Sequence, residues 1–244
     1  MDRTRFWAAP DICRALSTEA NDAVYGLKLF ADGALGSRTA AVYEPYADSG
    51  ELGRMMYSNA GLREALNECI AIGKPIAIHA IGDRAIDEVV SLLHALGPAL
   101  RAVPEIRIEH AQLISPATAR EARRLGVKLS MQPNFSEDSI DYADRLGPAR
   151  SAMNNPFRML IDDVGYVPGV DLLFGSDGMP HGVAAALRAA LFPPYEQQSL
   201  TVDEFVQGYC FPPGSPGSIA VEISGRDIVY SVLPVERTRT CSST

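Results

Sequence analysis

A chain of 244 residues, 47% of them hydrophobic, can bury a full core and fits one large domain. Its formal charge of −8 and its pI near 5.0 argue against nucleic acid or an anionic membrane surface as the main partner. No apolar run approaches the roughly 20 residues that a membrane helix needs. Residues 1–5 are not followed by the apolar core of a signal peptide.

The four cysteines lie far apart in the sequence, at Cys13, Cys69, Cys210 and Cys241. No Cys-x-x-Cys pair occurs, so neither a zinc finger nor a disulfide framework is indicated. A reduced, cytoplasmic setting is therefore expected.

Short apolar segments alternate with helical patterns along most of the chain. Strands are predicted at residues 24–30, 76–79, 106–109, 127–131 and 171–174. Strands that alternate with helices indicate a parallel sheet with helices packed against it. Periodicity alone does not choose between an open sheet and a barrel.

The helical patterns carry start and stop signals. Over residues 86–93, apolar side chains recur at i, i+3, i+4 and i+7, which is one face of a helix. Other helices are marked by an N-cap ahead of proline or by the spacing of a capping box. The candidate caps and stops are Asp83, Gly97, Ser115, Gly126 and the pair Thr201 and Glu204.

The end of the chain differs in pattern. Residues 219–223 and 227–232, separated by a short polar turn, predict a β-hairpin. A Pro/Gly-rich segment at residues 212–217 precedes it and suits a boundary between subdomains. We therefore expect a larger α/β portion at residues 1–211 and a hairpin with a tail at residues 212–244.

Ligand-type side chains occupy the places where the predicted strands end. Lys28 lies within the first strand, and His79 closes the second. His110 and Asp177 follow later strands. Catalytic groups of parallel sheets and barrels project from the carboxyl ends of strands. Imidazole nitrogens and carboxylate oxygens suit zinc or a similar divalent ion, which can activate water near neutral pH.

Each of these residues also has an ordinary structural interpretation. A histidine at a strand end can be a satisfied core residue, and a lysine can reach solvent with its stem packed, as Lys28 would. Asp177 follows Gly-Ser and could cap a turn. The joint occurrence on separate strand ends favours the functional interpretation. His94, within a helix near its end, is expected at the surface.

Five motifs, in order and at matching spacing, cover roughly residues 24–210. They are residues 27–40 (LKLFADGALGSRTA), 78–85 (IHAIGDRA), 107–112 (RIEHAQ), 130–133 (SMQP) and 174–177 (FGSD). They resemble the fourth to eighth barrel strands of the amidohydrolase superfamily, in its amidohydrolase 3 branch. That branch includes N-substituted formamide deformylases. The resemblance implies an α/β fold, an incomplete TIM-type (β/α) barrel of metal-dependent hydrolases, followed by a C-terminal β-hairpin from a small β-sandwich.

The resemblance also implies roles for individual residues. His79 and His110 would bind a divalent metal, by preference zinc, and a carbamylated Lys28 would add an anionic oxygen, bridging two ions if two are present. Asp177 would contact the metal and its water and act as the catalytic general base. The substrate, a small molecule, would be oriented by Arg38, Arg84, Gln132 and His181. Arg38 and Arg84 also fit ordinary surface positions.

The chain departs from the family pattern at its start. Family members carry a His-x-His pair on the first barrel strand, whereas the only histidines here are His79, His94, His110 and His181. We expect residues 24–30 to form the first barrel strand of this chain, with an unpaired edge. The interpretations left open are a fragment, a homo-oligomer, or a barrel completed by a complementary chain.

Two functions follow from these observations. The first is hydrolysis of an amide, formamide or cyclic amide bond, that is, a carbon–nitrogen bond other than a peptide bond, by metal-activated water. The second is a catalytically inactive, truncated module that binds a metal or a partner. The missing His-x-His pair favours the second, and the set of Lys28, His79, His110 and Asp177 favours the first.

Overall fold

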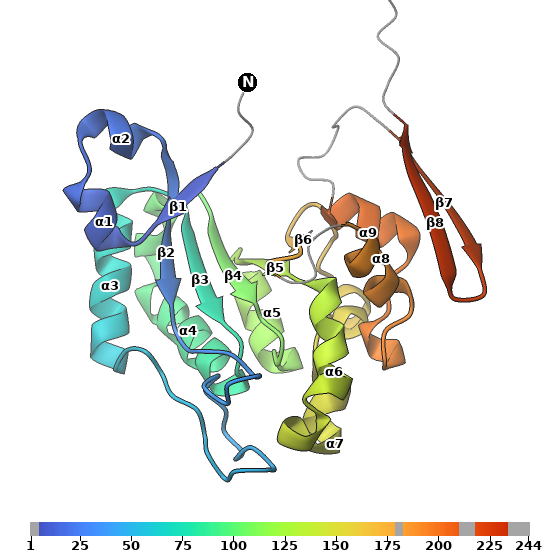
Figure 1. The fold of residues 1–244 in the computed structure, drawn as a ribbon. Helices are drawn as coiled ribbons and strands as arrows, with labels where there is room; N and C mark the ends of the chain where they lie inside the picture. Colours follow the sequence, from blue (N-terminus) through green and yellow to red (C-terminus); the bar gives the residue numbers. More distant parts are fainter. Residues whose placement is uncertain (1–4, 179–182, 210–217, 234–244) are drawn as a thin grey trace, which may run out of the picture.

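The computed structural model describes residues 5–178, 183–209 and 218–233 and contains a parallel sheet of six strands (Figure 1). All neighbouring strands of this sheet run parallel. The strands are β1 (Phe6–Ala8), β2 (Val24–Phe30), β3 (Ile76–Ala80), β4 (Ile106–His110), β5 (Lys128–Met131) and β6 (Leu172–Phe174). The strands from residue 24 onward match the five predicted segments to within a residue or two.

The order of the strands decides the architecture. They lie side by side as β1-β2-β3-β4-β5-β6, without the reversal that marks a doubly wound sheet. An order that never reverses keeps the crossover helices on one face, as in a (β/α) barrel. The fold is therefore the expected incomplete TIM-type barrel.

The helices begin and end close to the predicted signals. Ser115 Oγ accepts from the backbone N–H of Thr118, and Thr201 and Glu204 form the expected capping box. One signal was placed a residue too late: Gly82 is the N-cap, and Asp83 is the first helical residue. The α-helices are α1 (Pro10–Ala15), α2 (Thr18–Asp22), α3 (Asn59–Ile72), α4 (Asp83–Leu96), α5 (Pro116–Arg124), α6 (Asp138–Asp141), α7 (Ala143–Met153), α8 (Val183–Leu191) and α9 (Val202–Tyr209).

Four shorter helical segments connect these elements. Three are 3-10 helices and one is a π-helix. They are η1 (Gly97–Ala102), η2 (Pro133–Glu137), η3 (Met159–Val164, the π-helix) and η4 (Glu196–Gln198). No helix in the described ranges is both long enough and apolar enough to cross a membrane.

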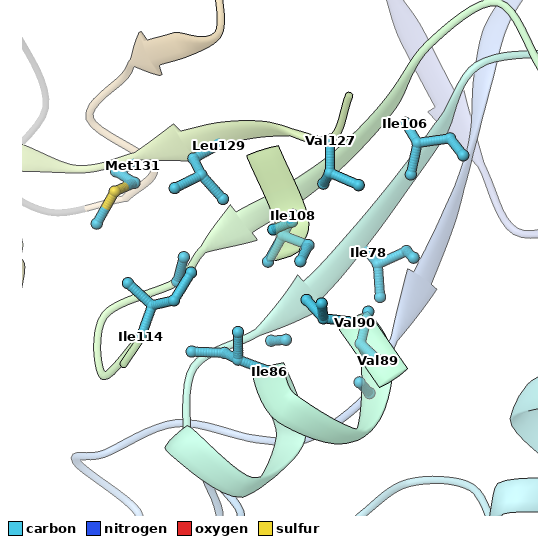
Figure 2. Close-up of a cluster of buried hydrophobic side chains, with 14 of the residues drawn as sticks. Ile78, Ile86, Val89, Val90, Ile106, Ile108, Ile114, Val127, Leu129 and Met131 are labelled. Carbon is cyan, nitrogen blue, oxygen red and sulfur yellow. The ribbon is translucent and has the colours of Figure 1, made fainter. Parts of the chain in front are cut away.

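The two faces of the sheet have different chemistry because side chains alternate along a strand. One face is apolar, and Figure 2 shows Ile78 and Ile108 packed against Ile86 and Val89 of α4. Burying each such side chain contributes about 1.5–3 kcal/mol. The alternate positions carry Lys28, His79, Arg107 and Glu109, so the face away from these helices is charged.

The packing under α4 predicts a clear effect on stability. Ile108 is fully buried, so Ile108→Ala should lower the free energy of unfolding by about 2–5 kcal/mol. Ile140, on α6, is 65% exposed, and Ile140→Ala should change it by no more than about 0.5 kcal/mol. Urea unfolding of both variants measures the difference. Equal losses would contradict this assignment of the core.

The expectation that residues 24–30 form the first strand was wrong. β1 pairs with β2 in parallel, aligning Trp7 with Gly26 and Ala8 with Leu27. Trp7 lies so close that a Cβ on Gly26 would be 2.3 Å from its ring. β1 has three residues, too few for a periodicity signal. Its pairing ends at Leu27, so the rest of β2 has no described partner on that side.

The predicted hairpin is present. β7 (Ser218–Ser224) and β8 (Asp227–Leu233) pair antiparallel through a two-residue turn, in which Gly225 has φ +60°. The Pro/Gly-rich segment at 212–217 and the tail at 234–244 lie outside the described residues. The division at residue 211 therefore stays a prediction.

Candidate functional site

The predicted ligand residues meet at the carboxyl end of the sheet, where the arrowheads of β2, β3 and β4 lie in Figure 1. His79 is aligned with Phe30 across β2 and β3, and His110 is aligned with Ala80 across β3 and β4. Lys28 lies two residues before Phe30 in β2, where it is aligned with Ala77 of β3. The topology thus places the two histidines on adjacent strand ends, as the sequence predicted.

The two imidazole rings lie side by side, with centroids 4.5 Å apart and planes at 69°. His79 Nε2 is 2.8 Å from the carbonyl oxygen of Gly33, which can only accept, so Nε2 carries the proton. His110 Nδ1 is 2.7 Å from Oε1 of Gln132 and donates to it. The nitrogens without a proton are therefore Nδ1 of His79 and Nε2 of His110.

Burial keeps both rings neutral at pH 7. It lowers the pKa of His79 to about 4, with the neighbouring His110 as the second cause. It also lowers the pKa of His110, against the opposing effect of its hydrogen bond to Gln132. A neutral imidazole offers a lone pair, which is the form that binds a metal.

Lys28 and Asp177 lie within electrostatic reach of the histidines. Burial lowers the pKa of Lys28 below its usual value, while Glu109 and Asp177 oppose this. The Asp177 Oδ2 atom is 3.8 Å from Nε2 of His110, and the Asp177 side chain is 62% exposed. The carboxylate thus lies at the mouth of the site, on the side of His110 that carries no proton.

The backbone is strained at this end of the sheet. His110 has φ +74°, Ala111 φ +48° and Asp177 φ +36°, although none is a glycine. Such conformations cost about 1–3 kcal/mol each and persist where surrounding contacts fix them, often at functional sites. Two of the predicted ligand residues are among the strained positions.

A buried hydrogen-bond network fixes the Gln132 side of His110. Asn155, fully buried, donates from Nδ2 to the backbone oxygen of Gln132 at 2.9 Å. Its own backbone N–H donates to the carbonyl of Gln112 at 2.9 Å. Gln112 in turn donates to Asp138 and to Asn154. These hydrogen bonds hold the backbone of Gln132 in place, and with it the acceptor for His110.

Sequence reasoning missed a residue beside His79. Asp32 is buried and accepts hydrogen bonds from the backbone N–H groups of Ala41, Ile81 and Gly82. Burial raises the pKa of Asp32 to about 7, and these three donors oppose the rise. The signal was its position directly after a strand, within the LKLFADGALGSRTA motif. The sequence alone gave Asp32 no role, because two of its hydrogen-bond donors, Ile81 and Gly82, lie 49 and 50 positions away in the chain.

The predicted substrate-binding residues are more scattered. Arg38 forms a bidentate ion pair with Asp48, and Arg84 Nε is 2.8 Å from Oε1 of Glu88 on its own helix. Gln132 is buried against His110, and His181 lies outside the described residues. Their substrate contacts stay predictions.

His94, which was expected at the surface, has a side chain that is 60% exposed and pairs with Glu121, away from the strand ends.

The donor set can be compared with what a divalent ion requires. No three His, Cys, Asp or Glu side chains among the described residues converge closely enough to form a metal site by themselves. Two neutral imidazoles with unprotonated nitrogens, a half-buried lysine and a carboxylate do lie together. These residue types fit a divalent ion with an open position, with Lys28 as an oxygen donor once carbamylated.

Comparison with known proteins gives a consistent result. Residues 12–189 match the Amidohydro_3 model, described as "Amidohydrolase family". The chain is 32% identical over 137 residues to "Putative amidohydrolase YtcJ" of Bacillus subtilis, covering 55% of this chain and 26% of that protein. It is 34% identical over 129 residues to "Protein LONG AFTER FAR-RED 3" of Arabidopsis thaliana, covering 52% and 22%.

A solved structure agrees in fold. An uncharacterized metal-dependent hydrolase from Pyrococcus furiosus superposes with a TM-score of 0.68 at 25% identity, covering 84% of this chain and 43% of that one. The chain spans about a quarter of the length of the curated relatives and less than half of this hydrolase. Because the family model matches well over half of the sequence, the chain belongs to the amidohydrolase family.

Proposed function

We propose that this chain forms the catalytic portion of a metal-dependent hydrolase that cleaves carbon–nitrogen bonds other than peptide bonds, in an amide, formamide or cyclic amide. The observation that carries the proposal is the meeting of Lys28, His79, His110 and Asp177 at one end of a barrel-type sheet. Membership of the amidohydrolase family and the likeness to a metal-dependent hydrolase support it.

The metal is proposed to be one divalent ion per chain, by preference zinc. His79 would bind through Nδ1 and His110 through Nε2, because their other nitrogens are used. A carbamylated Lys28 would add an oxygen ligand and would remove a buried cation. When bound, such an ion lowers the pKa of water to about 7 and polarises the scissile carbonyl.

Asp177 is proposed to hold and move the proton. Its carboxylate lies at the mouth of the site and is largely exposed, so it can accept a proton from the attacking water. The same group can return that proton to the departing nitrogen. Amide nitrogen is a poor leaving group without this proton, which explains why an acid is needed at this position.

Substrate selection is proposed to fall to the loops around this end. Arg38, Arg84 and His181 remain candidates for orienting a small-molecule substrate, and Arg38 and Arg84 would have to exchange an ion pair for a substrate contact. Gln132 has its oxygen committed to His110, so a substrate contact would use its amide nitrogen.

The setting and assembly are also proposals. Two described cysteines, Cys13 and Cys69, are free and buried, which supports a reducing cytoplasmic compartment.

The part of β2 beyond Leu27 has no described partner on the side of β1, and unpaired strand edges promote association with other strands. We therefore infer a homo-oligomer or a complementary chain that completes the barrel, which light scattering distinguishes from a monomer.

The test is a hydrolysis assay coupled to elemental analysis. The full chain, reconstituted with zinc and bicarbonate at neutral pH, should hold about one ion and hydrolyse at least one class within a panel of formamides, amides and cyclic amides. Removing the metal with a chelator should abolish turnover, and adding zinc should restore it. A chain that binds no metal after reconstitution would contradict the proposal.

The alternative function is a catalytically inactive metal- or partner-binding module, which is favoured by the lack of a His-x-His pair among the four histidines of this sequence. Zinc binding without turnover of any class in the panel would support this module over the enzyme.

A further inference from the structure

The side chain of Asp32 is fully buried and lies between two loops at the carboxyl end of the sheet. Oδ2 accepts from the backbone N–H of Ala41 and of Gly82, each at 2.9 Å. Oδ1 accepts from the backbone N–H of Ile81 at 3.0 Å. The carboxylate thus ties the loop after β2 to the loop after β3.

The same carboxylate faces the imidazole of His79. Oδ1 of Asp32 is 3.6 Å from Nε2 of His79, and the carbonyl of the next residue, Gly33, accepts from that nitrogen at 2.8 Å. Two acceptors on consecutive residues therefore lie on the Nε2 side of the ring. A proton on Nε2 is attracted by both, whereas a proton on Nδ1 would leave a ring lone pair facing two oxygens.

We propose that Asp32 is a positioning residue that holds His79 in the Nε2-protonated form, so that Nδ1 stays available as a ligand atom. Ligating histidines usually donate their second ring nitrogen to a carboxylate or carbonyl, which fixes the ring and its tautomer. The predicted effect on metal affinity rests on the proposed function. The predicted tautomer of His79 is independent of that function, because it is a property of the metal-free chain.

A purely structural role is the competing explanation, and the chain offers a matched control. Asp138 is also an aspartate with buried surroundings, which raise its pKa to about 6, and it accepts from Nε2 of Gln112 at 2.9 Å. It belongs to the network on the other side of His110. Replacing either aspartate disturbs a carboxylate that accepts hydrogen bonds, but only Asp32 lies against His79.

The experiment uses the full, metal-free chain with 15N-labelled histidine at pH 8, with the His79 signals assigned from His79→Gln. The parent should show His79 protonated on Nε2. Asp32→Asn should shift the ring toward the Nδ1-protonated form, because an amide has one acceptor oxygen and cannot replace both carboxylate atoms. Zinc affinity should fall about 10–100-fold, the usual effect of losing such a partner. Asp138→Asn should leave the tautomer of His79 unchanged, because Asp138 does not contact that ring.

Two results would overturn the proposal. One is a parent protein in which His79 carries its proton on Nδ1, a measurement that needs no variant to fold. The other is a folded Asp32→Asn that keeps both the tautomer and the affinity for zinc. A parent that shows the Nε2 tautomer yet binds no zinc would contradict the proposed function while leaving the role of Asp32 supported.

Discussion

Asp177→Asn should lower the rate of hydrolysis roughly 10²–10⁴-fold, the usual contribution of general acid–base assistance, while the metal content stays the same. Asparagine keeps the size of the side chain and one oxygen, so the site near His110 is preserved. It cannot take a proton from water at neutral pH. The exposure of this side chain, 62%, also means that the substitution should not disturb the core.

The measurement is kcat for a substrate that the parent accepts, together with metal content after reconstitution. Asp162→Asn is a suitable control, because Asp162 is 57% exposed and lies in η3, before β6 and away from the carboxyl ends of the strands. It should retain parental turnover. An Asp177→Asn variant with near-normal kcat would rule out the proposed base, whatever the metal content.

The parts of the fold that the sequence predicted depend on local signals. The capping box at Thr201 and the cap at Ser115 are formed by residues within three positions of each other. The strands from residue 24 onward are apolar runs bounded by helices. β1 gave no such signal, because three residues form a strand only where Trp7 can pack onto Gly26 of the neighbouring strand.

The site residues likewise divide into those that local signals predict and those that depend on tertiary contacts. His79 and His110 were predictable because parallel strands bring their carboxyl ends to one edge, whatever the details of packing. Asp32 was not, because its role depends on Ile81 and Gly82, which the fold brings to it from another strand end. The choice of tautomer depends equally on tertiary contacts such as that of Gln132 with His110.

His79→Ala and His110→Ala should each reduce the bound metal from about one ion per chain to almost none. Each removes one of only three proposed protein ligands, and Lys28 with a single imidazole leaves too few donors for a stable zinc site. His94→Ala should keep the ion, because His94 is exposed on α4 and pairs with Glu121. Elemental analysis after reconstitution with zinc and bicarbonate measures all three variants.

Thermal unfolding provides a second readout that does not depend on turnover. A ligand that binds only the folded chain stabilises it by about 4 kcal/mol at a concentration of 1,000 Kd, so zinc should raise the Tm of the parent and of His94→Ala. Adding zinc should not change the Tm of His79→Ala or of His110→Ala. His79→Ala and His110→Ala also lose the hydrogen bonds to Gly33 and Gln132, so each variant is compared with itself, with and without zinc. Metal loss from all three variants alike would show that the ion is held elsewhere on the chain.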